Sequence, residues 1–278
     1  MKSGQKLQSL ILRSLVWLFA AITACTALGI VGYILAKGVA YLSPRLFAWQ
    51  YTSENLSLLP AIVNTLTIAL LAFLIALPLG IFSAVYLNEY ARRGSRFVTM
   101  VNIAAETLSG IPSIVYGLFG YLLFVTHISG GYSLLAGALT LSIMILPIVL
   151  RTTQEALSSV PDSYRAGSFA LGAGKLRTVF RIALPAATPG ILAGVILCAG
   201  RIVGETAALI YTAGAVAQVP ENLLGSGRTL SVHLYALWNE GLHTNEAYAT
   251  AVVLLVCVAG LNALSSMLAK RIAKGRSK

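Results

Sequence analysis

The sequence predicts an all-α membrane protein with six transmembrane helices, and three observations support this fold class. The chain of 278 residues is 57% hydrophobic and only 10% charged, and its mean hydropathy is +0.81, a composition typical of polytopic membrane proteins. Uncharged runs recur that reach the roughly 20 residues a helix needs to cross a bilayer core. The charges gather in short segments between these runs, so we expect no sizeable soluble domain.

The six predicted spans follow one another with short polar connections. The first and the last are uncharged throughout, and the fifth is longer than a bilayer requires. The third carries Glu106 and the helix breakers Gly110 and Pro112. In chain order, the predicted spans are 14–36, 61–88, 97–125, 132–150, 185–219 and 247–269.

Lysine and arginine residues predict the orientation, because short cytoplasmic loops carry an excess of them. Of the 20 lysine and arginine residues, 16 are assigned to one side of the membrane. They come from the N-terminus, the connectors 89–96 and 151–184, and the C-terminal tail. The other side receives only three, which are Lys37, Arg45 and Arg228. We therefore expect a multi-pass membrane protein with both termini and the loop 151–184 in the cytoplasm. Its predicted parts are a cytoplasmic N-terminus at 1–13, a six-helix domain at 14–270 that includes the loop 151–184, and a basic tail at 271–278.

The composition argues against several other classes of protein. The net charge of +11 does not indicate nucleic-acid binding, because the basic residues lie at the ends of spans rather than in a stripe with aromatic residues. The three cysteines, Cys25, Cys198 and Cys257, lie far apart within apolar runs. We therefore expect neither a disulfide framework nor a metal site.

Arg201 and Glu205 interrupt the fifth predicted span near its middle. A charge at the centre of a membrane helix costs roughly 2.5–3.5 kcal/mol on insertion scales, so it is kept only when paired or beside a polar path. The i, i+4 spacing would place both on one helix face, and Gly200 and Gly204 would let a solute approach closely. One interpretation is a structural ion pair. We favour the other, a substrate path in which Arg201 meets an anion, Glu205 sets the charge balance and Thr206 is adjacent.

The cytoplasmic loop 151–184 contains the pattern of a short helix over 162–171. Asp162 or Ser163 is expected to be its N-cap, and Gly172 suits the position just after its end. Such a helix could dock in the groove of a partner or lie on lipid headgroups. The residues alone support both interpretations about equally.

Three stretches resemble a known family. Gly172, followed after nine residues by Ile-Ala-Leu-Pro at 182–185, resembles the end of the cytoplasmic "EAA" loop of ABC-importer permeases, with Ala166 where the family usually has a glutamate. The stretches GIPSIVYGLFG at 110–120 and RIVGETA at 201–207 are similar to the phosphate-importer permeases, and nearer the PstA type than its PstC partner. The resemblance covers most of residues 60–270.

The resemblance implies the type I ABC-importer permease fold, a location in the bacterial inner membrane and a set of partners. These are a homologous PstC-type permease that forms a heterodimer with this chain, a cytoplasmic ATPase dimer that uses ATP with Mg, and an extracytoplasmic phosphate-binding protein. The chain itself would bind no cofactor and would hydrolyse no ATP. The substrate path for inorganic phosphate would include Arg201, Glu205, Thr206 and Glu106. The residues expected to couple to the ATPase are Asp162, Ser163, Tyr164, Arg165, Ala166, Gly167, Ser168, Phe169, Ala170, Leu171 and Gly172.

Alternatives remain open at the level of the sequence. The permease could carry another oxyanion, such as sulfate, molybdate or phosphonate, and a secondary transporter or channel would need no docking helix. Glu106 either lines the substrate path or caps a helix break near the membrane interface. An intramembrane hydrolase is disfavoured, because neither H-E-x-x-H nor G-x-S-x-G occurs.

Overall fold

The computed structural model describes residues 2–92 and 94–274, and every regular element within them is helical. Arg93 and the last part of the predicted basic tail, residues 275–278, lie outside the described residues. Elements η1 and η2 are 3₁₀-helices, and η3, η4 and η5 are π-helices. In chain order, the elements are α1 (Lys2–Gly38), η1 (Val39–Tyr41), η2 (Pro44–Phe47), α2 (Leu59–Val85), η3 (Tyr86–Tyr90), α3 (Arg96–Ser109), α4 (Ser113–Gly120), η4 (Tyr121–Ser129), α5 (Leu134–Ser158), α6 (Asp162–Ala170), α7 (Lys175–Thr178), η5 (Val179–Ala183), α8 (Leu184–Gly204), α9 (Ala207–Ile210), α10 (Leu230–Glu240) and α11 (Thr244–Lys274).

Five helical segments within the described residues are long and apolar enough to cross a membrane. A sixth span is present if α3 and the α4–η4 helix are counted together, although they are bent by 100° at their junction. The predicted all-helical membrane fold is therefore confirmed. The five segments are Gln8–Tyr41, Leu59–Tyr90, Leu134–Ser158, Lys175–Gly204 and Thr244–Leu264.

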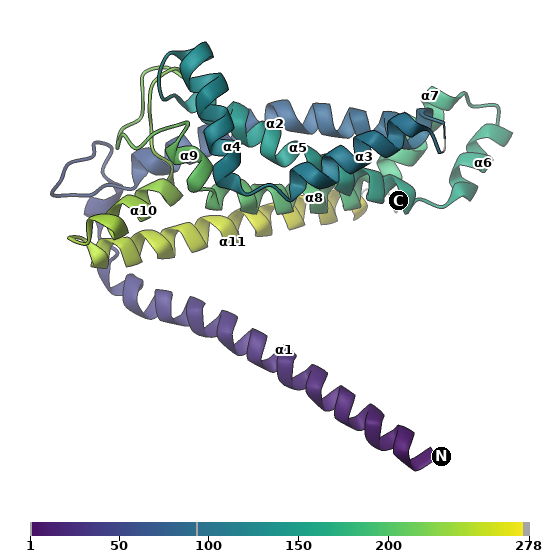
Figure 1. The fold of residues 1–278 in the computed structure, drawn as a ribbon, viewed down its shortest axis with the longest axis horizontal. Coiled ribbons are helices and arrows are strands. Elements are labelled where there is room, and N and C mark those ends of the chain that lie inside the picture. Colours follow the sequence, from purple (N-terminus) through teal and green to yellow (C-terminus); the bar gives the residue numbers. More distant parts are fainter. Residues whose placement is uncertain (1, 93, 275–278) are drawn as a thin grey trace.

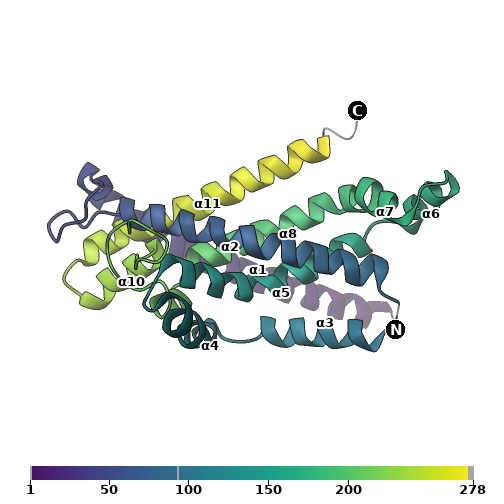
Figure 2. The ribbon, with the colours of Figure 1, turned by 90° about the horizontal axis from the view of Figure 1, so that it is seen from above.

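The third predicted span is not the single helix expected over 97–125. The helix is interrupted between Ser109 and Ser113, and Figure 2 shows α3 and α4 running in different directions. Pro112 causes the break, because proline has no N–H to donate and disfavours helical backbone in the preceding residue. The Tyr116 hydroxyl donates to the carbonyl of Leu108 at 2.8 Å, so α4 is fastened to the last turn of α3.

The fifth predicted span, 185–219, is wrong in its second half. Helix α8 ends at Gly204, and the following residues form the short α9 and an irregular segment, 211–229. This segment folds over the start of α5 and supplies hydrogen-bond acceptors to its first N–H groups. The carbonyls of Thr212, Gly225 and Leu223 accept from Ser133, Leu134 and Leu135 at 3.0, 3.0 and 2.9 Å. The apolar residues beyond 204 thus serve the core and the cap of α5.

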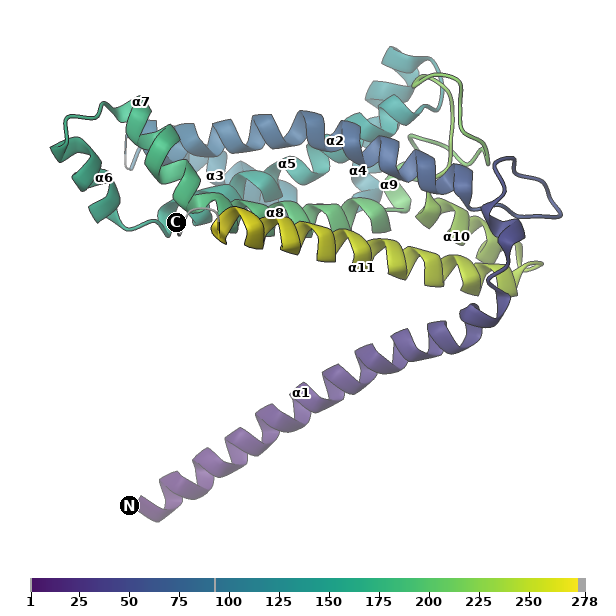
Figure 3. The ribbon, with the colours of Figure 1, turned by 180° about the vertical axis from the view of Figure 1, so that it is seen from behind.

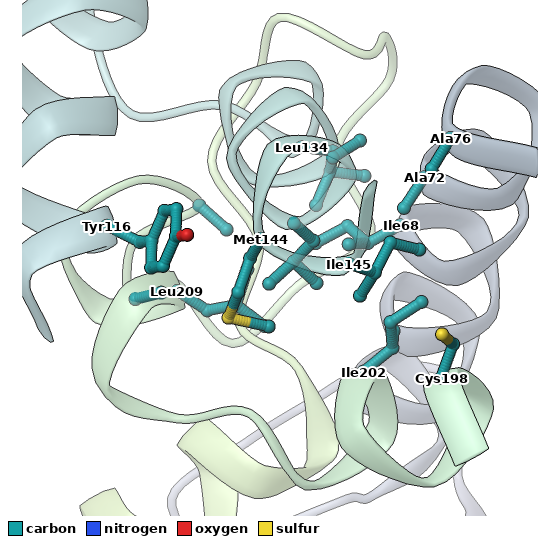
Figure 4. Close-up of a cluster of buried hydrophobic side chains, with 14 of the residues drawn as sticks. Ile68, Ala72, Ala76, Tyr116, Leu134, Met144, Ile145, Cys198, Ile202 and Leu209 are labelled. Carbon is teal, nitrogen blue, oxygen red and sulfur yellow. The ribbon is translucent and has the colours of Figure 1, made fainter. Parts of the chain in front are cut away.

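The core lies where α2, α4, α5, α8 and α9 meet (Figure 4). Ile68 of α2, Ile145 of α5 and Ile202 of α8 are almost fully buried there. Helices α2 and α5 approach closely because Gly80 has no side chain. A Cβ at Gly80 would lie 2.6 Å from Cγ1 of Val149.

Helix α1 lies largely apart from the bundle. It joins the other helices at its C-terminal end and diverges from them toward its N-terminus (Figures 1 and 3). The rings of Tyr33 and Tyr248 meet edge to face near the junction, with centroids 6.0 Å apart. The N-terminus, the end of α11, and helices α6 and α7 all lie toward one end of the molecule, and α10 lies toward the other (Figure 1).

Candidate functional site

Arg201 and Glu205 do not lie on one helix face, contrary to the sequence-based expectation. Helix α8 ends between them, and Glu205 adopts extended backbone with φ −73° and ψ 124°. Among the described residues, no ion pair joins Arg201 to Glu205 or to any other carboxylate. Arg201 therefore sits in the last turn of a helix rather than in the middle of one, and the structural ion-pair interpretation fails.

Glu205 is buried at the start of α9, with 8% of the residue exposed. Its Oε1 accepts a hydrogen bond from the backbone N–H of Ala208 at 3.0 Å, and its carbonyl accepts from the Ser231 hydroxyl at 2.6 Å. A carboxylate that accepts from the first N–H groups of a helical turn satisfies donors that would otherwise lack partners. Thr206, which follows Glu205, is half-buried. Glu205 thus fixes the turn that follows α8.

Arg201 is exposed on the surface of this chain. The surroundings are open, because a Cβ added at Gly200 or Gly204 would meet no atom within 4 Å. A cation is also favoured at this position, since the carbonyls at the C-terminus of a helix carry partial negative charge. The result is a guanidinium beside open space at the end of an apolar helix.

Glu106 lies elsewhere. Its side chain is 70% exposed and faces Arg151 of α5, with 3.8 Å between the charged atoms. Asn102 and Gln154 join the same two helices by a hydrogen bond of 3.1 Å. Glu106 thus belongs to a contact between α3 and α5, and its place on the substrate path stays a prediction.

The predicted loop helix is present as α6. Gly172 has φ +79°, and the N–H groups of Gly172 and Ala173 donate to the carbonyls of Phe169 and Ser168 at 2.9 and 3.1 Å. This Schellman arrangement confirms the predicted role of Gly172. The predicted N-cap, Asp162 or Ser163, is wrong by one or two residues, because Pro161 is the last residue with non-helical backbone and Asp162 already lies in the first turn of α6.

The residues predicted to contact an ATPase divide between two faces. Tyr164, Phe169 and Leu171 are exposed, and Leu171 is 91% exposed. Ser168 instead turns toward α7, where its hydroxyl lies 2.8 Å from that of Thr178. Arg165 is also turned inward. Only the exposed set is available to a partner.

Sequence reasoning missed Glu89, the partner of Arg165, because it treated 89–96 only as a polar connector. The two residues are 76 positions apart, so no local pattern indicates that they meet. They line a pocket of about 680 Å³ together with Asp162 and Lys175. The π-helical turn η3, which follows α2, is therefore in direct contact with α6.

A second buried polar cluster lies at the α10 end. The Arg228 guanidinium lies 4.7 Å from the centroid of the Tyr51 ring, and the His233 ring meets Tyr51 edge to face at 6.1 Å. Burial, and then the nearby charge of Arg228, lower the pKa of His233 from 6.5 to about 3. His233 is therefore neutral near pH 7. In the part of the chain that the structure covers, no three His, Cys, Asp or Glu side chains gather into a potential metal site.

Comparison with known proteins gives a consistent result. Residues 76–278 match the family described as binding-protein-dependent transport system inner membrane component. The chain is 33% identical over 280 residues to a probable ABC transporter permease protein, YqgI, of Bacillus subtilis (strain 168), covering 92% of this chain and 93% of that protein. It is 36% identical over 210 residues to the phosphate transport system permease protein PstA of Mycobacterium leprae (strain TN), covering 73% of this chain and 67% of that protein.

Two solved structures have the same fold. An inward-facing MetNI methionine ABC transporter matches with a TM-score of 0.60 at 20% identity, over 77% of this chain and 93% of that one. A bacterial alginate ABC transporter matches with a TM-score of 0.65 at 17% identity, over 98% of this chain and 96% of that one. The chain therefore belongs to the family of binding-protein-dependent transport system inner membrane components, and it is a non-catalytic permease subunit of an ABC transporter.

Proposed function

We propose that this chain is the permease subunit of an ATP-driven phosphate importer. The observation that carries the proposal is the exposed Arg201, which has no carboxylate partner among the described residues and lies close in the chain to Gly200 and Gly204, where an added Cβ would meet no atom within 4 Å. Lipid would make an unpaired charge costly, so this face of α8 is better suited to a polar path. The planar guanidinium offers several donors at once to a tetrahedral oxyanion. The relative of M. leprae, which is named as a phosphate permease, supports the same substrate.

Glu205 would help distinguish phosphate from sulfate. Its Oε1 is occupied by Ala208, while none of the described residues donates a hydrogen bond to Oε2. Phosphate near neutral pH still carries an acidic proton, which a carboxylate oxygen can accept as a hydrogen bond. Sulfate has no such proton, so the Glu205 carboxylate would only repel it. This repulsion would select phosphate over sulfate. Thr206 stands next to this carboxylate and would add a hydroxyl to the path.

The uncovered surfaces of the chain fit the proposed partners. Helix α1 carries apolar side chains that no other part of the described chain covers, as expected if lipid and a homologous PstC-type permease surround it. The exposed residues of α6 would dock in an ATPase dimer that uses ATP with Mg. The excess of Lys and Arg supports a cytoplasmic location for this end and for both termini. An extracytoplasmic phosphate-binding protein would then deliver phosphate at the α10 end.

Uptake of labelled phosphate tests the proposal in bacterial cells that lack only this chain. The wild-type chain is expected to restore uptake that excess sulfate does not inhibit. Arg201→Gln is expected to lower uptake about 10- to 100-fold, because a hydrogen bond to a charged group contributes ~1.5–3 kcal/mol.

Arg45→Gln is the matched control, since Arg45 is an exposed arginine in the loop after α1. Co-purification of the ATPase checks that each variant assembles. Wild-type uptake by an assembled Arg201→Gln complex, or competition by sulfate, would refute the proposal.

A further inference from the structure

Helix α2 extends to the loop 151–184 without an interruption in its helical backbone. It continues into the π-helical turn η3 without a break, so residues 59–90 form a single helical segment. Near its end, Glu89 is almost buried, with 8% of its side chain exposed. The carboxylate meets Arg165 of α6, whose side chain is 15% exposed. A transmembrane helix and the coupling helix are thus joined directly by opposite charges.

The contact between Arg165 and Glu89 is extensive. Arg165 Nη2 donates to Oε1 of Glu89 at 2.7 Å, and Nε lies 3.2 and 3.3 Å from the two carboxylate oxygens. The same guanidinium donates from Nη1 to the carbonyl of Val160 and from Nη2 to that of Leu157, at 2.8 and 2.9 Å. One side chain therefore connects α6, the end of α2 and the end of α5. The planar fork of arginine can serve all three, whereas a lysine ammonium cannot match this geometry.

The neighbours of Glu89 make equivalent contacts. The Ser158 hydroxyl of α5 donates to Oδ1 of Asn88 at 2.9 Å. The Lys175 ammonium of α7 lies 5.1 Å from the centroid of the Tyr90 ring, within range of a cation–π attraction. Three consecutive residues of η3, at the end of the α2–η3 segment, thus contact α5, α6 and α7 respectively.

We propose that Arg165 and Glu89 are positioning residues that make the coupling loop and the cytoplasmic end of α2 move as one body. When the ATPase displaces α6, the displacement then reaches α2 directly, in addition to the spans α5 and α8 to which the loop is covalently joined. Neither residue touches substrate. The inference rests on the proposed docking of α6 to an ATPase. It adds a third span, α2, to those driven by nucleotide.

Single substitutions test this role in the assembled complex in proteoliposomes. Glu89→Gln removes the buried carboxylate and leaves the part-buried Arg165 guanidinium with only the exposed Asp162 carboxylate, 3.4 Å from Nη1, as a charged partner, which weakens the contact between α6 and the end of the α2–η3 segment. We expect the ATPase to co-purify and to hydrolyse ATP as in the wild type, while phosphate moved per ATP falls about tenfold, or ~1.4 kcal/mol on the coupled step. Arg165→Lys should act in the same direction, because it keeps the charge but loses the fork.

Two exposed residues provide matched controls, Glu155→Gln near the end of α5 and Arg96→Lys at the start of α3. Both should keep the wild-type ratio of phosphate to ATP. A wild-type ratio in Glu89→Gln would overturn the inference. So would loss of the ATPase from that complex, because the pair would then serve assembly rather than coupling.

A disulfide provides a second test that does not depend on the transported solute. Oδ1 of Asn88 lies 2.9 Å from Oγ of Ser158, so these two positions are chosen for introduced cysteines, and disulfide formation on oxidation is checked first. The native cysteines Cys25, Cys198 and Cys257 are first replaced by serine. If α2 and the loop move as one body, oxidation should leave ATP hydrolysis by the complex unchanged. Inhibition that a reductant reverses would show relative movement and overturn the inference.

The two tests separate the failure of this inference from the failure of the proposed function. A wild-type complex that hydrolyses ATP but takes up no phosphate would refute the phosphate assignment. The disulfide result would still decide the positioning role.

Discussion

Replacing Gly117 by alanine should push α4 away from α9 and disturb the turn that holds Glu205. Gly117 packs directly on this turn. A Cβ at Gly117 would lie 2.8 Å from Cα of Ala208 and 3.3 Å from the carbonyl oxygens of Ala207 and Ala208. All three atoms belong to the backbone, so none of them can rotate away. The Ala208 N–H is also the donor that Glu205 binds.

The expected size of the effect follows from two opposing terms. Non-bonded carbon atoms pack best at about 3.5–4.0 Å, so the two segments must separate by roughly 1 Å. Overpacking of this kind costs about 1–3 kcal/mol. Alanine is better than glycine in a helix by about 1 kcal/mol, which offsets part of the cost. We therefore expect a net loss of about 1 kcal/mol of stability, together with reduced phosphate uptake because Glu205 moves.

Thermal unfolding of the purified complex and uptake in cells measure the two effects. Gly260→Ala is the control, because Gly260 lies within α11 and a Cβ there would meet nothing within 4 Å. The control should raise the midpoint of unfolding slightly, through helix propensity alone. If Gly117→Ala also raised the midpoint and kept wild-type uptake, the claimed contact between α4 and α9 would be wrong.

Two further predictions concern the ends of the molecule. A cysteine at Phe169 should crosslink to the partner ATPase, and a cysteine at Ser168 should crosslink less. The reason is that Phe169 is exposed whereas the Ser168 hydroxyl contacts α7. Equal crosslinking yields at the two positions, or none in a functional complex, would argue that α6 lies on lipid instead. At the other end, His233 has a pKa of about 3 in the folded chain against about 6.5 when unfolded, so the unfolded state binds more protons between these values. Stability from this residue is fully present above pH 6.5 and falls by about 1.4 kcal/mol per pH unit as the pH drops toward 3. Chemical unfolding of wild type and His233→Leu from pH 7 to pH 5 should show a smaller pH dependence in the variant, and parallel profiles would contradict the buried neutral state.

Local sequence signals correctly predicted the helical membrane fold and the end of the loop helix. Uncharged runs must become helices in a bilayer, because no water is present there to satisfy the backbone. Gly172 could be recognised because a left-handed residue at the end of a helix favours glycine. These features depend on a few neighbouring residues or on composition.

The same signals failed where a tertiary contact decides the conformation. Gly110 and Pro112 indicated a weak point, but the size of the bend depends on the hydrogen bond between Tyr116 and Leu108 and on packing against α9. The apolar run after Gly204 was read as membrane helix because it lacks charge. The first residues of this run, through Gly214, are mostly buried in the core instead, and hydropathy cannot distinguish these two apolar environments.

The sequence by itself determined that the chain crosses the membrane several times and that Arg201 and Glu205 are exceptional charges in an apolar setting, and it predicts that the basic segments face one side. Only the tertiary structure decided that these two residues do not pair, that Glu205 binds the start of α9, and that Arg165 binds Glu89. The physical reason is distance along the chain. Hydrophobic and charge patterns report interactions with solvent and near neighbours, whereas a partner 76 residues away is chosen by how the helices pack.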